Sequence, residues 1–129
     1  MCALGSERSY GIEGRVKPHK GWREALRQVI DPAVALVFEV DPAELGAATR
    51  RSPRAAFARQ VAMYLTHVVC GFGMTEVGAL FSRDRTTVAH ACEVVEDRRD
   101  DPELDSRVER LVCAVAAVIE ALSWRGRSK

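Results

Sequence analysis

Apolar residues recur at helical spacing through most of the chain. The clearest run is Phe57, Val61, Tyr64, Leu65 and Val68, which keeps the three-to-four-residue step of one helix face. No segment shows the strict alternation of a strand, and residues 1–20 are polar with no apolar period. The pattern predicts an all-α domain over residues 21–125, a small helical bundle, preceded by a mobile, mildly basic polar tail over residues 1–20.

Four dipeptides mark expected helix starts. They are Asp31-Pro32, Asp41-Pro42, Ser52-Pro53 and Asp101-Pro102. An Asp or Ser oxygen can accept a bond from an unpaired N–H of the first turn, and Pro at the first helical position lacks such an N–H. The elements expected outside the central segment are helices over 22–30 and 32–40, a single turn over 42–45, an irregular basic loop over 46–52, and helices over 53–70 and 102–123.

The segment over about 75–98 predicts a helix–turn–helix. Gly71 and Gly73 suit the exit from the preceding helix, and Thr75 is the expected cap of a short helix that ends at Phe81. Asp84 is the expected cap of the second helix, which runs to about Arg98. The inward positions are Val77, Leu80, Phe81, Val88, Ala91, Cys92 and Val95, and the outer positions are Arg85, Thr86, Ala89, His90 and Glu93.

Donors and acceptors gather at the start of the second helix of this motif. Arg85, Thr86 and Thr87 offer donors and hydroxyls beside the acceptor Asp84, and such groups read base edges and hold phosphates. The alternative is that the two threonines only occupy a solvent-exposed first turn.

Composition excludes several classes of protein. The chain has 129 residues, 47% of them hydrophobic, and a formal net charge of +1. No apolar run reaches the ~18 residues of a membrane helix, and the first residues lack a secretory signal. No phosphate-cradling glycine motif occurs, so we expect no ATP or dinucleotide cofactor. Asp84, His90 and Cys92 form no nucleophile–base set, so we expect no enzyme.

The four cysteines are expected to be thiols of a cytoplasmic protein. Cys2, Cys70, Cys92 and Cys113 are widely spaced, without a Cys-x-x-Cys pair. A zinc site made by Cys70, His90 and Cys92 is the alternative, and the absence of a regular four-ligand spacing disfavours it. No metal is therefore expected.

Charge is strongly separated along the chain. Residues 45–75 contain no Asp or Glu, but they carry Arg50, Arg51, Arg54, Arg59 and His67. Residues 93–109 contain eight acids against three arginines. Arginine forks suit phosphates and narrow minor grooves, so the acid-free stretch predicts contact with an anion. Ordinary solvated faces are the alternative interpretation.

Three motifs resemble the C-terminal DNA-binding domain of the bacterial chromosomal replication initiator, DnaA. They are Ala-Arg-Gln-Val-Ala-Met-Tyr-Leu from residue 58, Glu-Val-Gly-x-x-Phe from residue 76, and Arg-Asp-Arg-Thr-Thr-Val-x-His-Ala-Cys from residue 83. The resemblance covers about residues 34–111. It implies a helical bundle with a helix–turn–helix, preceded by a basic loop, that binds an A·T-rich duplex box of TTATNCACA type.

The resemblance also implies roles for single residues. Arg51, beside Arg50, falls where the family places a minor-groove arginine, and Arg59 matches a DNA-contacting arginine. Asp84, Arg85 and Thr86 match base-reading positions in the major groove. Phosphate contacts are implied for Thr87 and His90. The remaining candidates, taken from the acid-free stretch and the motifs, are Arg54, His67 and Arg83.

Three departures from the family pattern bear on function. Arg85 stands where the family has His, the turn before Asp84 is one residue shorter, and His67 replaces a common Lys. An ATPase module is also missing from the sequence. We therefore expect a nucleoid-associated regulator of transcription or replication initiation that occupies DnaA-box-like sites. The alternative is a protein-interaction module that dimerises through the apolar helix over 102–123.

Overall fold

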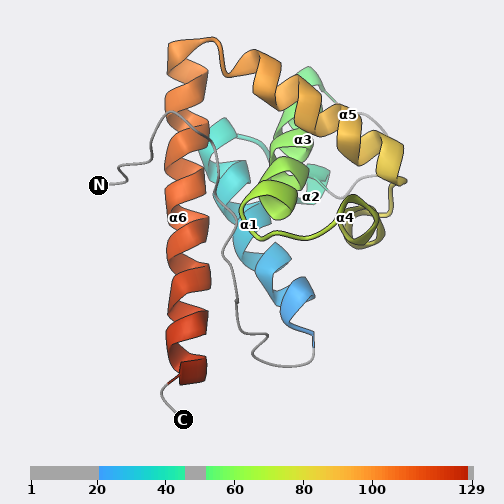
Figure 1. Cartoon of the computed structure of the whole chain (residues 1–129). Helices are drawn as coiled ribbons and strands as arrows, with labels where there is room; N and C mark the ends of the chain where they lie inside the picture. Colours follow the sequence, from blue (N-terminus) through green and yellow to red (C-terminus); the bar gives the residue numbers. More distant parts are fainter. Residues whose placement is uncertain (1–20, 46–51, 128–129) are drawn as a thin grey trace.

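The computed structural model describes residues 21–45 and 52–127, with side chains described up to Leu122. These residues form six helices and no strand, as the sequence predicts (Figure 1). The expected tail over 1–20, and Arg50 and Arg51 of the basic loop, lie outside them. The helices are α1 Trp22–Phe38, α2 Pro42–Leu45, α3 Pro53–Val68, α4 Met74–Phe81, α5 Arg85–Arg98 and α6 Pro102–Arg127.

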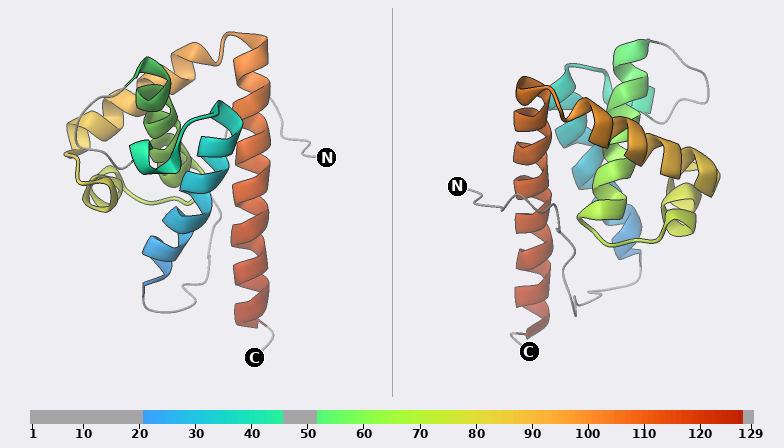
Figure 2. Two further views of the ribbon diagram at one scale, coloured as in Figure 1. Left: turned by 180° about the vertical axis from the view of Figure 1, so that it is seen from behind. Right: turned by 45° about the horizontal axis from the view of Figure 1, so that its top comes forward.

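Helix α3 runs through the middle of the bundle. In all views α6 lies along one side, next to α1, and the α4–α5 pair lies on the other side (Figures 1 and 2). Ile30 of α1, Val61 and Leu65 of α3, Val88 of α5 and Val112 of α6 are all completely buried. One apolar core therefore holds the helix–turn–helix, formed by α4 and α5, against the rest of the chain.

The prediction of a helix break at Asp31-Pro32 is wrong. Helix α1 continues through Pro32 and ends at Phe38, where Glu39 adopts a left-handed conformation with φ of 58° and its N–H bonds the carbonyl of Ala35. The proline removes one bond to the carbonyl of Gln28, and both residues are exposed, so water can replace that bond. The Asp31 carboxylate accepts bonds from Arg27 instead of capping a new helix.

Other expected helix starts are confirmed, with one exception. The Ser52 hydroxyl accepts from the Ala55 N–H at 3.1 Å, and the Asp41 carboxylate accepts from the Ala43 N–H at 3.0 Å. The exception is Thr75, which was expected to cap α4 but lies inside it, because α4 begins at Met74. The residue that caps α4 is Gly73, whose N–H donates to the Glu76 carboxylate at 3.1 Å. Helix α6 is also longer than expected and ends at Arg127.

A buried arginine joins α5 to α3 and α6. The side chain of Arg99 is 1% exposed and pairs with the carboxylates of Asp105 and Glu109 on α6. It also donates to the Tyr64 hydroxyl at 3.0 Å, which in turn donates to Glu96 at 2.6 Å. Burial and the bond to Glu96 raise the pKa of Tyr64, which keeps its hydroxyl protonated as a donor.

The cysteines differ from the expected set of thiols. Cys70 is a buried thiol and Cys92 a half-buried one, whereas Cys113 is disulfide-bonded. The expectation of a thiol is therefore wrong for Cys113, which lies half-exposed on α6 and can be reached from outside the core. Burial raises the pKa of Cys92 to about 11, so this thiol is a poor nucleophile. None of the described helices combines the length and apolarity needed to cross a membrane.

Candidate nucleic-acid interface

Six of the residues predicted to contact DNA surround one hollow of about 590 Å³ between α3 and the start of α5. We call this hollow the α3–α5 cleft. Its lining residues are Ala56, Arg59, Gln60, Met63, Arg83, Asp84, Thr86, Thr87 and His90. Residues more than 20 positions apart in the sequence are thus brought together in one concave, polar surface.

The first turn of α5 presents its polar groups to solvent. Asp84 caps the helix by accepting the Thr87 N–H at 2.8 Å, and this bond lowers the pKa of the carboxyl below its ordinary value. Asp84, Thr86, Thr87 and His90 are all exposed. The site therefore offers an ionised acceptor, two hydroxyls and an imidazole along one edge of α5.

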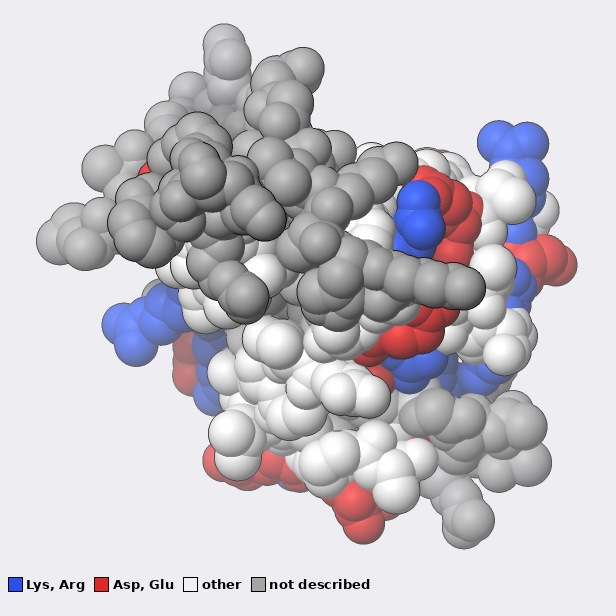
Figure 3. Space-filling view, turned by 90° about the horizontal axis from the view of Figure 1, so that it is seen from below, with Lys and Arg blue, Asp and Glu red and all other residues white. Residues whose placement is uncertain are grey.

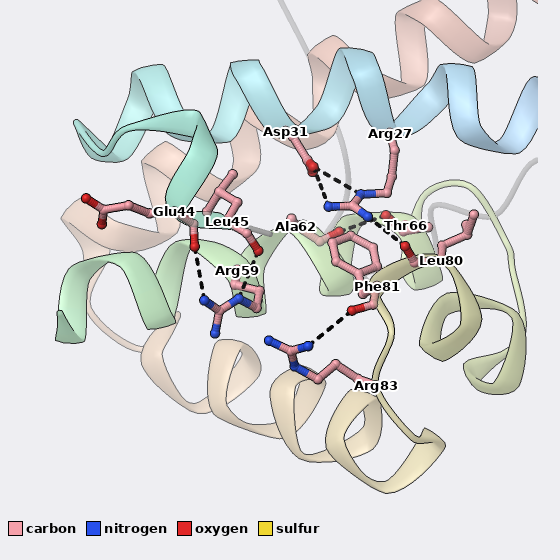
Figure 4. Close-up of polar contacts among 10 residues, drawn as sticks. All are labelled: Arg27, Asp31, Glu44, Leu45, Arg59, Ala62, Thr66, Leu80, Phe81 and Arg83. Atoms are coloured by element: carbon pink, nitrogen blue, oxygen red, sulfur yellow. Dashed lines mark hydrogen bonds and ion pairs between the residues drawn. The ribbon is translucent and has the colours of Figure 1, made fainter. Parts of the chain in front are cut away.

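Two contacts from α1 fix the end of α4, just before the turn. Arg27 donates to the carbonyl of Leu80 at 2.6 Å, and its guanidinium lies 4.0 Å above the Phe81 ring (Figure 4). Asp31 holds the same guanidinium from the other side, at 2.7 Å. Because Phe81 is followed directly by the turn that carries Arg83 and Asp84, α1 indirectly positions the first turn of α5.

Arg59 and Arg83 extend into the cleft from opposite sides, α3 and the turn (Figure 4). Arg59 donates from Nε to the carbonyl of Leu45 at 2.9 Å and from Nη2 to the carbonyl of Glu44 at 3.1 Å. Arg83 donates to the carbonyls of Phe81 at 3.3 Å and Ser82 at 3.2 Å. Both guanidinium groups are thus held in place by backbone oxygens.

Three further predicted residues do not line the cleft. Arg54 lies at the start of α3, is exposed, and faces Glu39 at 3.9 Å. His67 lies in the last turn of α3 and donates from Nδ1 to the carbonyl of Phe72 at 2.7 Å. Arg85 is exposed at the first position of α5. The two remaining candidates, Arg50 and Arg51, lie outside the described residues.

Three residues of the cleft wall were not predicted from the sequence. Ala56, Gln60 and Met63 share one face of α3 with Arg59. The helical spacing of residues 56, 59, 60 and 63 carries this signal, because positions three and four apart lie on one side of a helix. Gln60 adds an amide that can donate and accept beside the arginine.

The acidic run over residues 93–109, which begins in the second half of α5 and continues into α6, is partly internal. Glu96, Asp105 and Glu109 contact Tyr64 or Arg99, so three of its eight acids serve the fold rather than only the surface field. The face in Figure 3 shows charged side chains of both signs around an uncharged centre. Within residues 21–45 and 52–127, no three His, Cys, Asp or Glu side chains gather to hold a metal ion.

The fold and the site define a helix–turn–helix protein, and family comparison specifies it further. A family model described as the bacterial dnaA protein helix-turn-helix matches residues 28–95, just over half of the chain. The chain therefore belongs to this family. The matched range ends within α5 and contains every residue of the α3–α5 cleft.

Two relatives show the same similarity. Both are chromosomal replication initiator proteins DnaA, one from Symbiobacterium thermophilum and one from Lachnoclostridium phytofermentans. The first is 38% identical over 69 residues, which are 52% of this chain and 15% of the relative. The second is 31% identical over 103 residues, which are 69% of this chain and 23% of the relative. This chain thus spans less than a quarter of either relative.

Proposed function

We propose that this chain binds double-stranded DNA through the α3–α5 cleft and the preceding arginine-rich segment, and that it recognises DnaA-box-like sites. The observation that carries the proposal is the cleft itself, which joins the first turn of α5 to Arg59 and Gln60 of α3. In this arrangement the start of α5 enters the major groove, as recognition helices of this class do. Arg50 and Arg51 then contact the adjacent minor groove.

The residues divide between base reading and backbone contact. Asp84, Arg85 and Thr86 lie at the cap and first turn of α5, where side chains reach the floor of the major groove. Thr87 and His90 lie further along the same exposed edge, where phosphate oxygens pass. Arg54, Arg83 and His67 add positive charge or donors around this surface.

Fluorescence anisotropy on two labelled duplexes tests the proposal. One carries TTATCCACA and the other carries the same bases in shuffled order. We expect the chain to prefer the box by about tenfold or more, because each mismatched base pair typically costs about 1–3 kcal/mol. The variant Thr86→Ala should lose most of this preference, whereas Glu103→Gln, at an exposed position of α6, should keep it. Equal affinity for both duplexes would contradict box recognition.

The proposed biological role requires DNA binding and no catalysed reaction. We propose that the chain occupies initiator boxes in the cytoplasm, at the nucleoid, and so regulates transcription or replication initiation without hydrolysing ATP. The sequence carries no phosphate-cradling motif that would hold a nucleotide. Release of phosphate from ATP by the purified chain, with or without DNA, would contradict this part of the proposal.

Pairing of two copies through residues 102–123 is the second candidate function. It is less well supported, because the apolar stripe of α6 is already covered within the chain. Val108, Leu111, Val112, Val115 and Ile119 are each at most 3% exposed. Light scattering at a range of protein concentrations measures the mass directly, and a concentration-dependent doubling would favour this alternative.

A further inference from the structure

Two arginines of α1 hold α4 at both of its ends. Arg23 and Arg27 are four positions apart, so they lie on one face of α1. Arg27 contacts the last turn of α4, and Arg23 contacts the carboxylate that caps its first turn. We call this pair the α1 clamp. Because α4 is the first helix of the helix–turn–helix, the clamp fixes the orientation of the helix from which the turn departs.

At the C-terminal end of α4, Arg27 completes the hydrogen bonding of the helix. The last four carbonyls of a helix have no partner inside it. The carbonyl of Leu80 accepts from Nη1 of Arg27 at 2.6 Å, whereas its neighbours Ala79 and Phe81 accept from residues of the turn itself. Arg27 thus adds a contact that crosses to another helix. Its positive charge also suits the negative end of the helix dipole.

The guanidinium of Arg27 is itself fixed in place. Oδ2 of Asp31 accepts from its Nε at 3.0 Å and from its Nη2 at 2.7 Å, which leaves Nη1 for Leu80 (Figure 4). Its central carbon lies 4.0 Å from the centre of the Phe81 ring. The side chains of Arg27 and Asp31 are only 23% and 18% exposed. A planar fork held in this way sets the position of the end of α4.

At the N-terminal end of α4, Arg23 binds the capping carboxylate. Glu76 accepts the Gly73 N–H with Oε1 at 3.1 Å and faces Nη2 of Arg23 with Oε2 at 3.0 Å. The Arg23 guanidinium also lies 5.5 Å from the Trp22 ring and 5.6 Å from the Phe72 ring. The side chains of Arg23 and Glu76 are 37% and 46% exposed, so this contact is the weaker half of the clamp.

We propose that Arg23 and Arg27 are positioning residues for base reading by the first turn of α5. The rest of α5 is fixed independently, because Val88 and Val95 are completely buried in the core. The clamp therefore acts on the short turn between α4 and Asp84. The inference rests on the proposed DNA binding. Both arginines precede residues 28–95, the range matched by the family model, so they add to the matched domain.

The position of Arg27 separates this role from a direct contact with DNA. Arg27 does not line the α3–α5 cleft. It lines another hollow, of about 400 Å³, together with Asp31, Pro32 and Leu80 among others. Loss of the clamp should therefore change how well the first turn of α5 matches the base edges, which requires placement to within about 0.5 Å. It should leave the general attraction to phosphates nearly unchanged.

Arg107 on α6 is the matched control. It is half-exposed and pairs with Glu103 four positions away, as Arg27 pairs with Asp31, so its removal also costs one positive charge and one ion pair. Helix α6 lies on the side of the bundle opposite to α4 and α5 (Figure 1). A change that appears in Arg27→Met but not in Arg107→Met is therefore not an effect of net charge.

Fluorescence anisotropy measures the ratio of the dissociation constants for the shuffled and the TTATCCACA duplexes. We expect a ratio of about ten or more for the wild type and for Arg107→Met, and of about three or less for Arg27→Met. Arg23→Met should lie between these values. The affinity of Arg27→Met for the shuffled duplex should fall by no more than about twofold.

Amide hydrogen exchange locates the effect without DNA. The backbone N–H of Arg83 donates to the Gly78 carbonyl at 2.8 Å, within the turn. In Arg27→Met this amide should exchange about threefold faster or more, because the turn opens locally. The Arg99 N–H, bonded to the Val95 carbonyl at 3.0 Å at the far end of α5, should keep its wild-type rate. Unchanged exchange at Arg83 would overturn the clamp.

The wild-type measurement distinguishes the two proposals. Thermal melting checks that each variant is folded, and if Arg27→Met is unfolded, Arg27→Lys, which keeps the charge but not the fork, should give an intermediate ratio. A wild-type ratio in whichever of these variants is folded, or an equal loss in Arg107→Met, would overturn the positioning role and leave the proposed function intact. Absence of any preference in the wild-type chain would overturn both.

Discussion

The backbone of Arg83 passes directly over the Cα of Gly78. A Cβ built on Gly78 would lie 2.4 Å from the carbonyl oxygen of Arg83, and the Arg83 N–H donates to the Gly78 carbonyl at 2.8 Å. Real Cβ atoms do not approach backbone oxygens so closely, so any larger residue would push the turn away from α4. The close approach lets a short turn set the direction in which α5 leaves.

We therefore expect Gly78→Ala to damage both stability and DNA binding. The backbone cannot yield as a flexible side chain would, so the loss of unfolding free energy should be about 1–3 kcal/mol. Urea denaturation measures this loss and anisotropy measures DNA affinity.

The matched control for that substitution is Gly73→Ser. A Cβ on Gly73 meets nothing within 4 Å, and Ser is a favourable cap for α4. This variant should be as stable as the wild type or more so. Equal stabilities of Gly78→Ala and the wild type would contradict the account of the turn.

The Asp84 cap should make stability depend on pH. Its bond with the Thr87 N–H lowers the pKa from the ordinary 3.8, so the ionised carboxyl stabilises the fold above that pH. This contribution is lost as the pH falls through the lower, folded-state pKa. Asp84→Asn keeps a cap acceptor but has no charge, so the wild type should melt higher near pH 7, and the gap should close as the pH falls below the ordinary value of 3.8.

Glu93→Gln, on the same helix but away from its N-terminus, is the control for charge removal. It should not reproduce the pH-dependent gap. A constant difference between wild type and Asp84→Asn across this pH range would contradict the role of the ionised cap.

Loss of the buried Arg99 should be among the most destabilising polar substitutions. Arg99→Met leaves Asp105, Glu109 and the Tyr64 hydroxyl without their shared donor. Removing one partner of a fully buried ion pair lowers the free energy of unfolding by ~3–5 kcal/mol. Because both carboxylates are about a third exposed, we expect a loss of about 2–3 kcal/mol. Chemical denaturation measures this difference.

Arg107→Met provides the comparison on the surface of α6. Arg107 is half-exposed and pairs with Glu103 at 3.4 Å, so its removal should cost no more than about 0.5 kcal/mol. Similar losses for the two variants would show that the Arg99 network does not stabilise the junction of α3, α5 and α6.

Arg85 should determine part of the base preference. It is exposed at the first position of α5, and an arginine fork can span both acceptors of a guanine edge, whereas His makes one such contact. Arg85→His should shift the selected site toward the TTATNCACA type. Arg85→Ala should relax one or two positions by ~1–3 kcal/mol each.

Selection from a random duplex pool gives the site logo for each of the three proteins. The slope of log binding constant against log salt concentration should differ between Arg85→Ala and the wild type by at most about one, which corresponds to one phosphate contact. Identical logos would mean that Arg85 holds a phosphate, and that Asp84 and Thr86 read the bases.

Features of the fold could be predicted from the sequence where the interacting residues are close together in the chain. The Asp84 and Ser52 caps were predictable because cap and partner are three residues apart. The same signal failed at Asp31, since the Arg27 contact and solvent exposure around Pro32 allow α1 to continue. A local signal cannot reveal such competing contacts.

Long-range polar contacts were beyond the sequence pattern. Arg59 was predicted as a DNA contact, but its bonds to the carbonyls of Glu44 and Leu45 depend on how α2 packs on α3. Likewise, residues 93–109 were described only by their count of eight acids against three arginines, although Glu109 pairs with a buried arginine. A count of charged residues predicts the sign of the charge on a surface. It does not predict which carboxylates pair with buried groups in the folded chain.

The salt dependence of binding to random duplex DNA tests the central claim most directly. We expect the arginines of the acid-free stretch and the polar edge of α5 to make about four to six phosphate contacts. Only the contacts made by charged side chains release counterions and so contribute to the salt dependence. The account predicts a plot of log binding constant against log salt concentration with a slope of about −3 to −5. A slope near zero, or no binding at low salt, would contradict the assignment of this chain as a duplex-DNA-binding protein.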